Sequence, residues 1–252
     1  MNEPSPKKNQ HRSKYALVTG AGARVGRAIA LELARHGFYI IVHYHQNKVG
    51  AQETLEHVEA LGGAGQIAQA NLGDEMQRQA LISTTQQACP TLDVLVNNAS
   101  LFEPKAFAEL KLSDWQSMFE VNVVAPYILS QGLLPQLKAS QGLIVNLCDI
   151  GAERPLKGYT HYSSSKAALV GLTRSLAVEL APHIRCIGIS PGQVAWPPDF
   201  SEAQKSKIIQ RIPMARSGSP EDIARLLRFV LLEGHYLNGA VIPVDGGLSC
   251  RY

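Results

Sequence analysis

The sequence predicts an α/β protein, in which helices cover both faces of a parallel sheet of about seven strands. Short apolar runs alternate regularly with longer segments of helical periodicity. The apolar runs are continuous, as expected of strands that are buried on both faces. No linker, repeat or low-complexity segment divides the chain. We therefore expect one domain over residues 14–252, preceded by a flexible basic tail at residues 1–13.

Each element follows from its local pattern. Residues 15–19 form an apolar run closed by a glycine and predict the first strand, while Val25, Ile29 and Leu33 recur at helical spacing and predict a helix over 24–36. Further strands are expected at 38–42, 65–70, 92–96, 143–147, 184–189 and 240–244. Further helices are expected at 48–61, 74–88, 113–138, 160–181, 202–211 and 220–232. The helix over 113–138 must absorb Pro126, and residues 191–218 are otherwise irregular and rich in proline.

Composition excludes several classes of protein. Hydrophobic residues make up 45% of the chain and charged residues 18%, which excludes a disordered protein. No apolar run approaches the roughly 20 residues of a membrane helix, and the basic N-terminus lacks the apolar stretch of a secretory signal. The net charge of +3 comes entirely from residues 1–14, so we expect no nucleic-acid partner. The four cysteines are widely spaced, which indicates no metal site, no disulfide framework and a cytoplasmic location.

A glycine-rich loop follows the first predicted strand. Gly20, Gly22 and Gly26 occur in it, and a helix is expected to begin near Arg24. Free backbone N–H groups and the helix dipole make such a loop an anion site, so we expect it to bind a dinucleotide. The contacts are expected from Gly20, Arg24, Val25 and Gly26. An ordinary tight turn is the alternative.

The segment after the second strand bears on the choice of nucleotide. Residues 43–48 contain no acid, three candidate cations and several hydrogen-bond donors. A carboxylate at this place would bind the ribose 2′-hydroxyl and repel a 2′-phosphate. The segment therefore favours NADP, with contacts from Tyr44, His45, Gln46 and Asn47; solvated loop residues are the alternative.

Four further features indicate catalysis. Tyr162 and Lys166 are four residues apart on a predicted helix, where an ammonium would lower the pKa of the phenol. Asn97–Ser100 follow the fourth strand directly. Asn122 lies inside a predicted helix, where a buried amide needs a hydrogen-bond partner. Asp149 ends the fifth strand, thirteen residues before Tyr162.

Together with Pro191-Gly192 and Asp245-Gly246-Gly247, and in this order, these motifs resemble the short-chain dehydrogenase/reductase family over residues 14–250. The resemblance implies a single Rossmann-like, doubly wound domain that transfers hydride between a nicotinamide and a small substrate, as a homotetramer. It implies that Tyr162 is the acid/base, that Lys166 binds the nicotinamide ribose and that Asn122 holds a water of a proton relay. The remaining cofactor contacts are expected at Asn71, Leu72, Asn98, Ala99, Ser100, Lys166, Pro191 and Gly192.

Two residues depart from the usual family pattern. Asp149 stands where most members have a serine that donates a hydrogen bond to a carbonyl substrate. An ionised carboxylate cannot donate and would repel an oxyanion, so Asp149 opposes plain ketone reduction and suits a C=N bond or N–H donors. The alternative is that it caps a loop or pairs with Arg154. Arg24 replaces a glycine, and its guanidinium could hold phosphate and face the substrate; a solvated side chain is the alternative.

At Arg24, at Asp149 and in the His-Tyr-His stretch at residues 43–45, the sequence resembles the pteridine reductases. The resemblance implies NADPH-dependent reduction of dihydropterins and, in some members, of dihydrofolate. Gln46, Asn47 and Asn71 depart from the pteridine reductase or family pattern. Substrate contacts are expected at Arg24, Ser100, Phe102, Asp149, Tyr162 and Trp196. Phe102 would stack on the pterin ring, and Trp196 belongs to an expected substrate lid over residues 193–215 that includes Pro197 and Pro198.

Two alternatives remain open. A generic carbonyl reductase, for a 3-oxoacyl thioester or a sugar, would share the fold, Tyr162 and Lys166. A non-catalytic NADP-binding sensor or scaffold would share the fold, but it would have no need of a proton relay.

Overall fold

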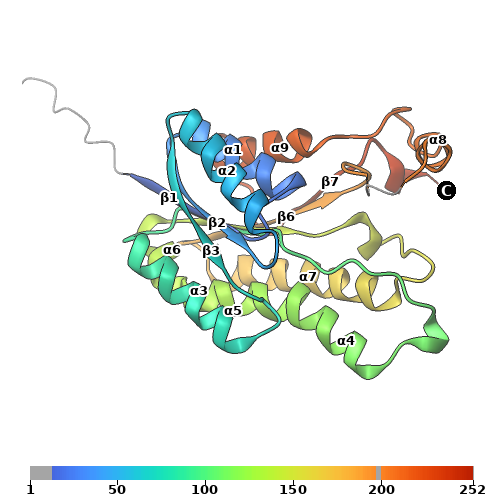
Figure 1. Cartoon of the computed structure of the whole chain (residues 1–252), viewed down its shortest axis with the longest axis horizontal. Coiled ribbons are helices and arrows are strands. Elements are labelled where there is room, and N and C mark those ends of the chain that lie inside the picture. The colour runs from blue at the N-terminus through green and yellow to red at the C-terminus, as the bar shows by residue number, and fades with distance from the viewer. Residues whose placement is uncertain (1–12, 197–199, 252) are drawn as a thin grey trace, which may run out of the picture.

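A seven-stranded, fully parallel sheet forms the centre of the computed structural model, which describes residues 13–196 and 200–251 (Figure 1). The strand order is β3-β2-β1-β4-β5-β6-β7, and a single domain with this doubly wound sheet confirms the predicted fold class. The strands are β1 (Lys14–Val18), β2 (Phe38–Tyr44), β3 (Ala64–Gln69), β4 (Val94–Asn97), β5 (Leu143–Leu147), β6 (Arg185–Pro191) and β7 (Val241–Val244).

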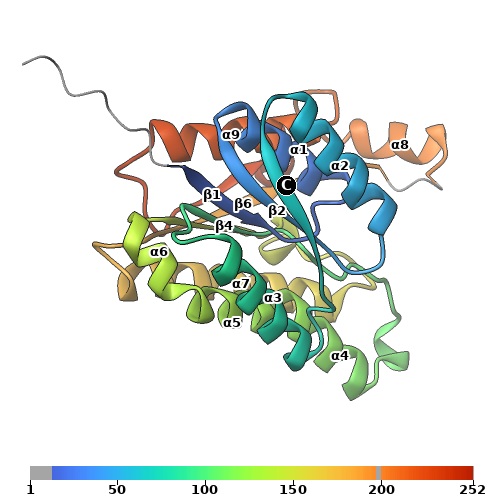
Figure 2. The same cartoon turned by 60° about the vertical axis from the view of Figure 1, so that its left-hand side comes forward.

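Helices cover both faces of the sheet, in two layers that are visible from both directions of view (Figures 1 and 2). One layer holds α1 (Arg24–Arg35), α2 (Lys48–Ala60) and α9 (Pro220–Leu232), and α8 (Glu202–Ile209) lies beyond it. The other layer holds α3 (Glu75–Ala88), α4 (Leu112–Phe119), α5 (Ala125–Gly132), α6 (Leu134–Ser140) and α7 (Thr160–Glu179).

Alternate strand residues supply two hydrophobic cores. Ala16 and Val18 of β1 belong to the core beneath α1 and α9, while Leu17 belongs to the core beneath α3, α5 and α6. All three side chains are fully buried. Burial of one aliphatic side chain of this size contributes about 1.5–3 kcal/mol, so apolar residues are needed on both faces of every central strand. This double burial explains why the strands appear in the sequence as continuous apolar runs.

The single helix expected over residues 113–138 is wrong, because the chain forms three α-helices here, α4, α5 and α6. A π-helical turn, Glu120–Val124, separates α4 from α5, and the N–H of Ala125 donates to the carbonyl of Glu120. Pro126 lies at the start of α5, where a missing N–H costs least. The extra residue of a π-turn changes the direction of the side chains that follow, and Asn122 lies within this turn.

Smaller differences concern element ends. The fourth strand begins at Val94 instead of residue 92, and α8 ends at Ile209 instead of residue 211. Residues 1–12 of the expected tail, and Pro197 and Pro198 of the expected lid, lie outside the described residues. Within the described part of the chain, no helix combines the length and the apolar character needed to cross a bilayer.

Candidate active site

The glycine loop after β1 packs directly on the end of β4. Thr19 Oγ1 accepts hydrogen bonds from the N–H groups of Asn98 and Ala99 at 2.8 and 3.0 Å, and Asn98 Nδ2 donates to the Thr19 carbonyl at 2.7 Å. Gly20 has a φ of +63°, and a Cβ on Gly26 would lie 2.6 Å from Asn98 Nδ2. Only glycine fits at such a close approach, so this loop is held rigidly at the carboxyl edge of the sheet.

The first turn of α1 fits an anion. Ala23 caps the helix without a side-chain hydrogen bond, and the first turn holds no acidic residue in the described structure. The N–H groups of this turn are therefore available to a pyrophosphate. Arg24 has a φ of +51°, which is unfavourable for a residue with a Cβ, and its Nη2 donates to the carbonyl of Ala195 at 3.1 Å. Arg24 thus joins the glycine loop to the segment that carries Trp196.

His43 is not one of the cations that the sequence suggested for a 2′-phosphate. Its side chain is 1% exposed, and Nδ1 accepts the N–H of Gly20 at 3.0 Å. Nε2 is therefore the protonated nitrogen, and it donates to the carbonyl of Ala70 at 3.0 Å. Burial lowers the pKa of His43 to about 4, so the ring is neutral. His45 and Lys48 remain exposed at this edge.

The other expected nucleotide contacts lie at the same edge of the sheet. Asn47 caps α2 by accepting the N–H of Gly50 at 3.0 Å, and it donates to the carbonyl of Gly22 at 3.3 Å. Asn71 accepts the N–H of Gly73 at 2.9 Å. The side chains of Tyr44 and Leu72 are buried, with 5% exposure each, so these two residues present mainly backbone groups to a ligand.

The buried Tyr162 and the partly buried Asp149 form a hydrogen-bonded pair. The phenol donates to Asp149 Oδ2 at 2.8 Å, while Oδ1 accepts the N–H of Gly151 at 2.6 Å. Asp149 therefore caps the short turn at residues 150–152, as the alternative interpretation predicted, and its other oxygen accepts from Tyr162, the expected acid/base. Asp149 thus makes both the structural contact and the functional contact that the sequence suggested.

Burial and the neighbouring carboxylate both raise the pKa of the Tyr162 phenol. Burial raises the pKa of Tyr162 well above its ordinary value, and the nearby Asp149 carboxylate raises it further. Burial also raises the pKa of Asp149 and lowers the pKa of Lys166. Lys166 Nζ lies 5.8 Å from the centroid of the Tyr162 ring, and the expectation that it lowers the pKa of the phenol stays a prediction. Tyr162 is held as a neutral phenol, ready to donate a proton.

Asn122 connects several parts of the site. Its Oδ1 accepts the N–H of Leu101 at 2.8 Å and the hydroxyl of Ser100 at 3.1 Å. Its Nδ2 donates to Ser165 Oγ, on α7, at 3.0 Å. The Asn122 amide thus meets the hydrogen-bonding requirement of a buried asparagine by joining the loop after β4 to α7.

Lys166 is anchored separately, because its Nζ donates to the carbonyl of Leu147 at 2.7 Å.

Two aromatic rings, those of Phe102 and Tyr159, lie beside the ring of Tyr162. Phe102 is 48% exposed, stacks on Tyr159 with 4.5 Å between ring centroids, and meets Tyr162 edge-on at 4.7 Å. Trp196 packs obliquely on Phe200, with 6.1 Å between centroids. Pro191 ends β6, and Gly192 follows at a position where a Cβ would lie 2.6 Å from Asp245 Cβ.

The sequence reasoning missed Thr19, Tyr159 and Ser165 as parts of this site. Thr19 holds the end of β4, Tyr159 stacks on Phe102, and Ser165 accepts from Asn122. Tyr159 and Ser165 each lie three residues from Tyr162, so helical spacing would have pointed to both. The role of Thr19 depends on a strand about 80 residues away, which no local pattern reveals.

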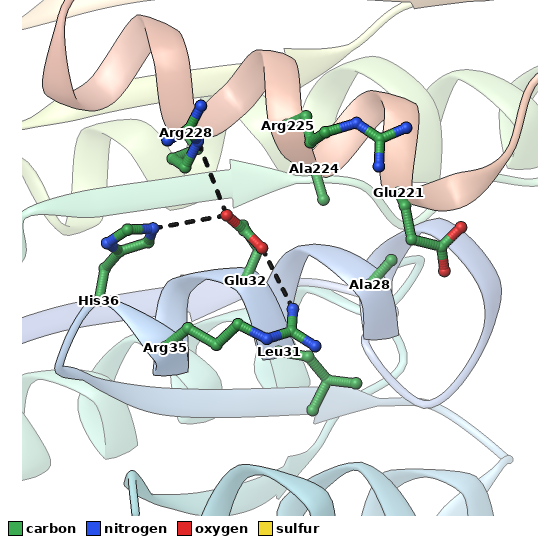
Figure 3. A pocket seen from close by; sticks show the side chains of 9 residues that line it. All are labelled: Ala28, Leu31, Glu32, Arg35, His36, Glu221, Ala224, Arg225 and Arg228. Atoms are coloured by element: carbon green, nitrogen blue, oxygen red, sulfur yellow. Dashed lines mark hydrogen bonds and ion pairs between the residues drawn. The ribbon is translucent and has the colours of Figure 1, made fainter. Parts of the chain in front are cut away.

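A separate pocket of about 450 Å³ opens between α1 and α9 (Figure 3). Glu32 lies in it, within 3.1 Å of Arg35, 3.4 Å of His36 and 3.8 Å of Arg228. Its carboxylate is thus surrounded by basic groups from both helices, which favours the packing of α9 on α1. None of the residues expected to bind cofactor or substrate lines this pocket. The described residues also contain no group of three or more His, Cys, Asp and Glu side chains arranged for a metal ion.

A doubly wound parallel sheet, a glycine loop at its switch point and a buried Tyr–Lys–Asn set define the class of nucleotide-dependent oxidoreductases. The comparisons narrow this class. Residues 20–249 match the sequence profile of the family described as enoyl-(acyl carrier protein) reductase. The chain belongs to the short-chain dehydrogenase/reductase family.

Individual relatives cover almost the whole chain. The 3-oxoacyl-[acyl-carrier-protein] reductase of Synechocystis sp. is 33% identical over 241 residues, which span 94% of this chain and 97% of the relative. Glucose 1-dehydrogenase 2 of Bacillus subtilis is 32% identical over 244 residues, which span 94% and 95%. The crystal structure of acetoin dehydrogenase from Enterobacter cloacae superimposes with a TM-score of 0.88 at 32% identity, covering 96% of this chain and 98% of that one.

These findings establish an oxidoreductase of a family that binds NAD or NADP. The names of the relatives agree better with the carbonyl-reductase alternative than with the pteridine reductase subgroup.

Proposed function

We propose that the protein is an NADPH-dependent reductase of dihydropterins, which reduces a C=N bond of the pterin ring. The hydrogen bond from Tyr162 to Asp149, at 2.8 Å, carries this proposal. A carboxylate beside the proton donor disfavours an oxyanion, the species that forms when hydride adds to a ketone. It favours a substrate whose amino-pyrimidine edge offers N–H donors.

The residues present fit the nicotinamide cofactor. The uncapped first turn of α1 and the close approach of Gly26 to Asn98 leave a backbone cradle for a pyrophosphate. His45 and Lys48, with no acid in residues 43–48, support a preference for the 2′-phosphate of NADPH. When bound, the cofactor supplies the hydride.

The chain's own residues supply the proton and the orientation. Tyr162 donates its phenolic proton toward the ring nitrogen, since its raised pKa keeps that proton in place at neutral pH. Asp149 accepts from the amino-pyrimidine edge or passes the proton on. Lys166 holds the nicotinamide ribose, and Asn122 holds the water of the relay. Arg24, Ser100 and the exposed face of Phe102 position the flat ring, which an aromatic side chain can stack.

Reduction of a 3-oxoacyl thioester is the second candidate, and the names of the relatives favour it. In that reaction Tyr162 would protonate the carbonyl oxygen. Asp149 would have to be protonated for the site to tolerate the developing negative charge, and burial moves the pKa of Asp149 in that direction.

One assay separates these candidates. The oxidation of NADPH is followed with dihydrobiopterin, dihydromonapterin and dihydrofolate, beside a panel of ketones and an acetoacetyl thioester. Turnover of a pterin but not of the ketones, lost in Tyr162→Phe, is the expected result. Turnover of the thioester with inert pterins would transfer the protein to the carbonyl reductases. Binding of NADPH without any turnover would favour a sensor or scaffold.

A further inference from the structure

A buried arginine outside the residues discussed so far contacts two parts of the site at once. Arg78, on α3, is 5% exposed. Its Nη1 donates to the carbonyl of Leu72 at 2.7 Å and to Glu120 Oε2 at 2.9 Å. Leu72 belongs to the loop after β3, where Asn71 and Leu72 are expected to contact the cofactor. The family resemblance implies that the adenine lies near Asn71, so we call this segment, residues 70–74, the adenine loop. Glu120 begins the π-turn that carries Asn122.

The loop and the π-turn also lie close to each other. A Cβ built on Gly73 would lie 3.7 Å from Val121 Cγ2, so one added methyl group would bring the two segments into van der Waals contact. The N–H of Arg78 donates to the carbonyl of Asp74 at 3.0 Å, so the loop leads without a break into the helix that carries the guanidinium. A displacement of the loop would therefore be transmitted to the π-turn.

Stability alone gives little reason for a guanidinium at this place. Arg78 Nε is buried and has no hydrogen-bond partner within the described ranges, and the Glu120 side chain is 41% exposed. Burial of a charge is costly, and a pair of this kind is often replaced by apolar residues without loss of stability. The guanidinium is better explained by the two groups that it holds together.

We infer that Arg78 is a positioning residue, which links the adenine loop to the π-turn that presents Asn122. Occupation of the loop by the adenine half of the cofactor then fixes the π-turn. Asn122 carries this effect to α7 through its 3.0 Å hydrogen bond to Ser165, three residues after Tyr162. The inference rests on the proposed function for the roles of Asn122 and of the adenine loop.

The test compares two arginines that both donate to backbone carbonyls, the buried Arg78 and the partly buried Arg185, in the full-length protein. Arg78→Met keeps the length of the side chain and removes the guanidinium. We expect the Kd of NADPH, measured by its fluorescence, to rise roughly fivefold or more, with a similar fall in kcat at saturating NADPH and little change in the melting temperature. Arg185→Met is the matched control, because Arg185 donates to three carbonyls at the end of α9, remote from Leu72 and Glu120. It should lower the melting temperature and leave the Kd unchanged.

Hydrogen exchange tests the link itself and needs no substrate. In the natural protein, NADPH should slow amide exchange in residues 118–126 as well as in the glycine loop. In Arg78→Met, saturating NADPH should slow exchange in the glycine loop only. Because binding and exchange are read without turnover, a failure of the pterin assay leaves this result interpretable.

Two outcomes would overturn the inference. One is natural affinity and natural protection of residues 118–126 in Arg78→Met. The other is a loss of affinity in Arg78→Met that is accompanied by a fall in melting temperature as large as that of Arg185→Met. If Arg78→Met does not fold, Glu120→Gln replaces it, since this change weakens only the contact with the π-turn. It should lower kcat with an unchanged Kd, and an unchanged kcat would refute the link.

Discussion

Asp149 decides how the proton of Tyr162 is held. Its carboxylate raises the pKa of the phenol both by its charge and by accepting the hydrogen bond. Asp149→Asn removes the charge but keeps an acceptor for the N–H of Gly151. We therefore expect the pKa of Tyr162 to fall, so that activity, which needs the protonated phenol, declines at a lower pH than in the natural protein. The pH–rate profile measures this shift, and an alkaline limb that stays in place would contradict the assignment.

His43 gives the fold a dependence on acidity. Its pKa is about 4 in the folded protein and 6.5 ordinarily, so the unfolded chain takes up a proton that the folded chain refuses. The contribution of His43 to stability is therefore present above pH 6.5 and is lost as the pH falls toward 4, by at most about 1.4 kcal/mol per pH unit. Urea unfolding at several pH values should show a flatter dependence in His43→Gln. The exposed His183→Gln serves as control.

Arg24 holds an unfavourable backbone conformation at the start of α1. A φ of +51° is unfavourable by about 1 kcal/mol for a residue with a Cβ, whereas glycine adopts it without this cost. Arg24→Gly should raise the free energy of unfolding by up to about 1 kcal/mol, while the Kd of NADPH also rises because the guanidinium is gone. Calorimetry and a fluorescence titration measure the two effects. A variant that is less stable and binds NADPH normally would show that Arg24 has only a structural role.

At the scale of elements, a buried polar chain joins β4, β5 and α7. Asn146 is fully buried, accepts from Asn97 Nδ2 at 2.8 Å and donates to Thr173 Oγ1 at 2.9 Å. Asn146→Leu leaves Asn97 Nδ2 without its acceptor, while Thr173 Oγ1 still donates to the carbonyl of Leu169 at 2.8 Å, and it should cost about 1–3 kcal/mol in denaturant unfolding. Asn97→Leu in the same chain should restore part of this loss, because it removes the orphaned amide. A double variant that is no more stable than the single one would contradict this reasoning.

The elements also show what the sequence could predict. Strands such as residues 143–147 were predicted with their observed ends, since burial on both faces demands an unbroken apolar run. The π-turn at Glu120–Val124 was not predicted, because its extra residue depends on packing against α3 and α7 and leaves no mark in the local periodicity. Likewise, the positions of Tyr162 and Asp149 were predicted but not their direct contact. The interpretation of His43 as a cation failed because only the folded structure shows that it is buried.

At the scale of the whole molecule, the homotetramer remains a prediction from the family resemblance. The outer face of α7 exposes Ala167, Gly171 and Val178, and a Cβ on Gly171 would meet nothing within 4 Å. Small residues allow a second helix to approach closely. Light scattering should give a mass of four chains of 27.3 kDa each. Gly171→Arg should reduce that mass, and a monomeric natural protein would remove the prediction.

The strand order also has a consequence for folding during synthesis on the ribosome. In the folded sheet β1 lies between β2 and β4, yet β4 is translated roughly 80 residues after β1. At ordinary rates of synthesis this delay lasts about 4–16 s. During that interval β1 has one open edge, and Thr19 and Gly20 lack the partners that Asn98 and Ala99 later provide. The glycine loop lies among the first residues of the domain, but it can reach its folded conformation only after residue 99 has left the exit tunnel. A nascent chain stalled before that point should fail to retain NADPH, however complete its glycine motif.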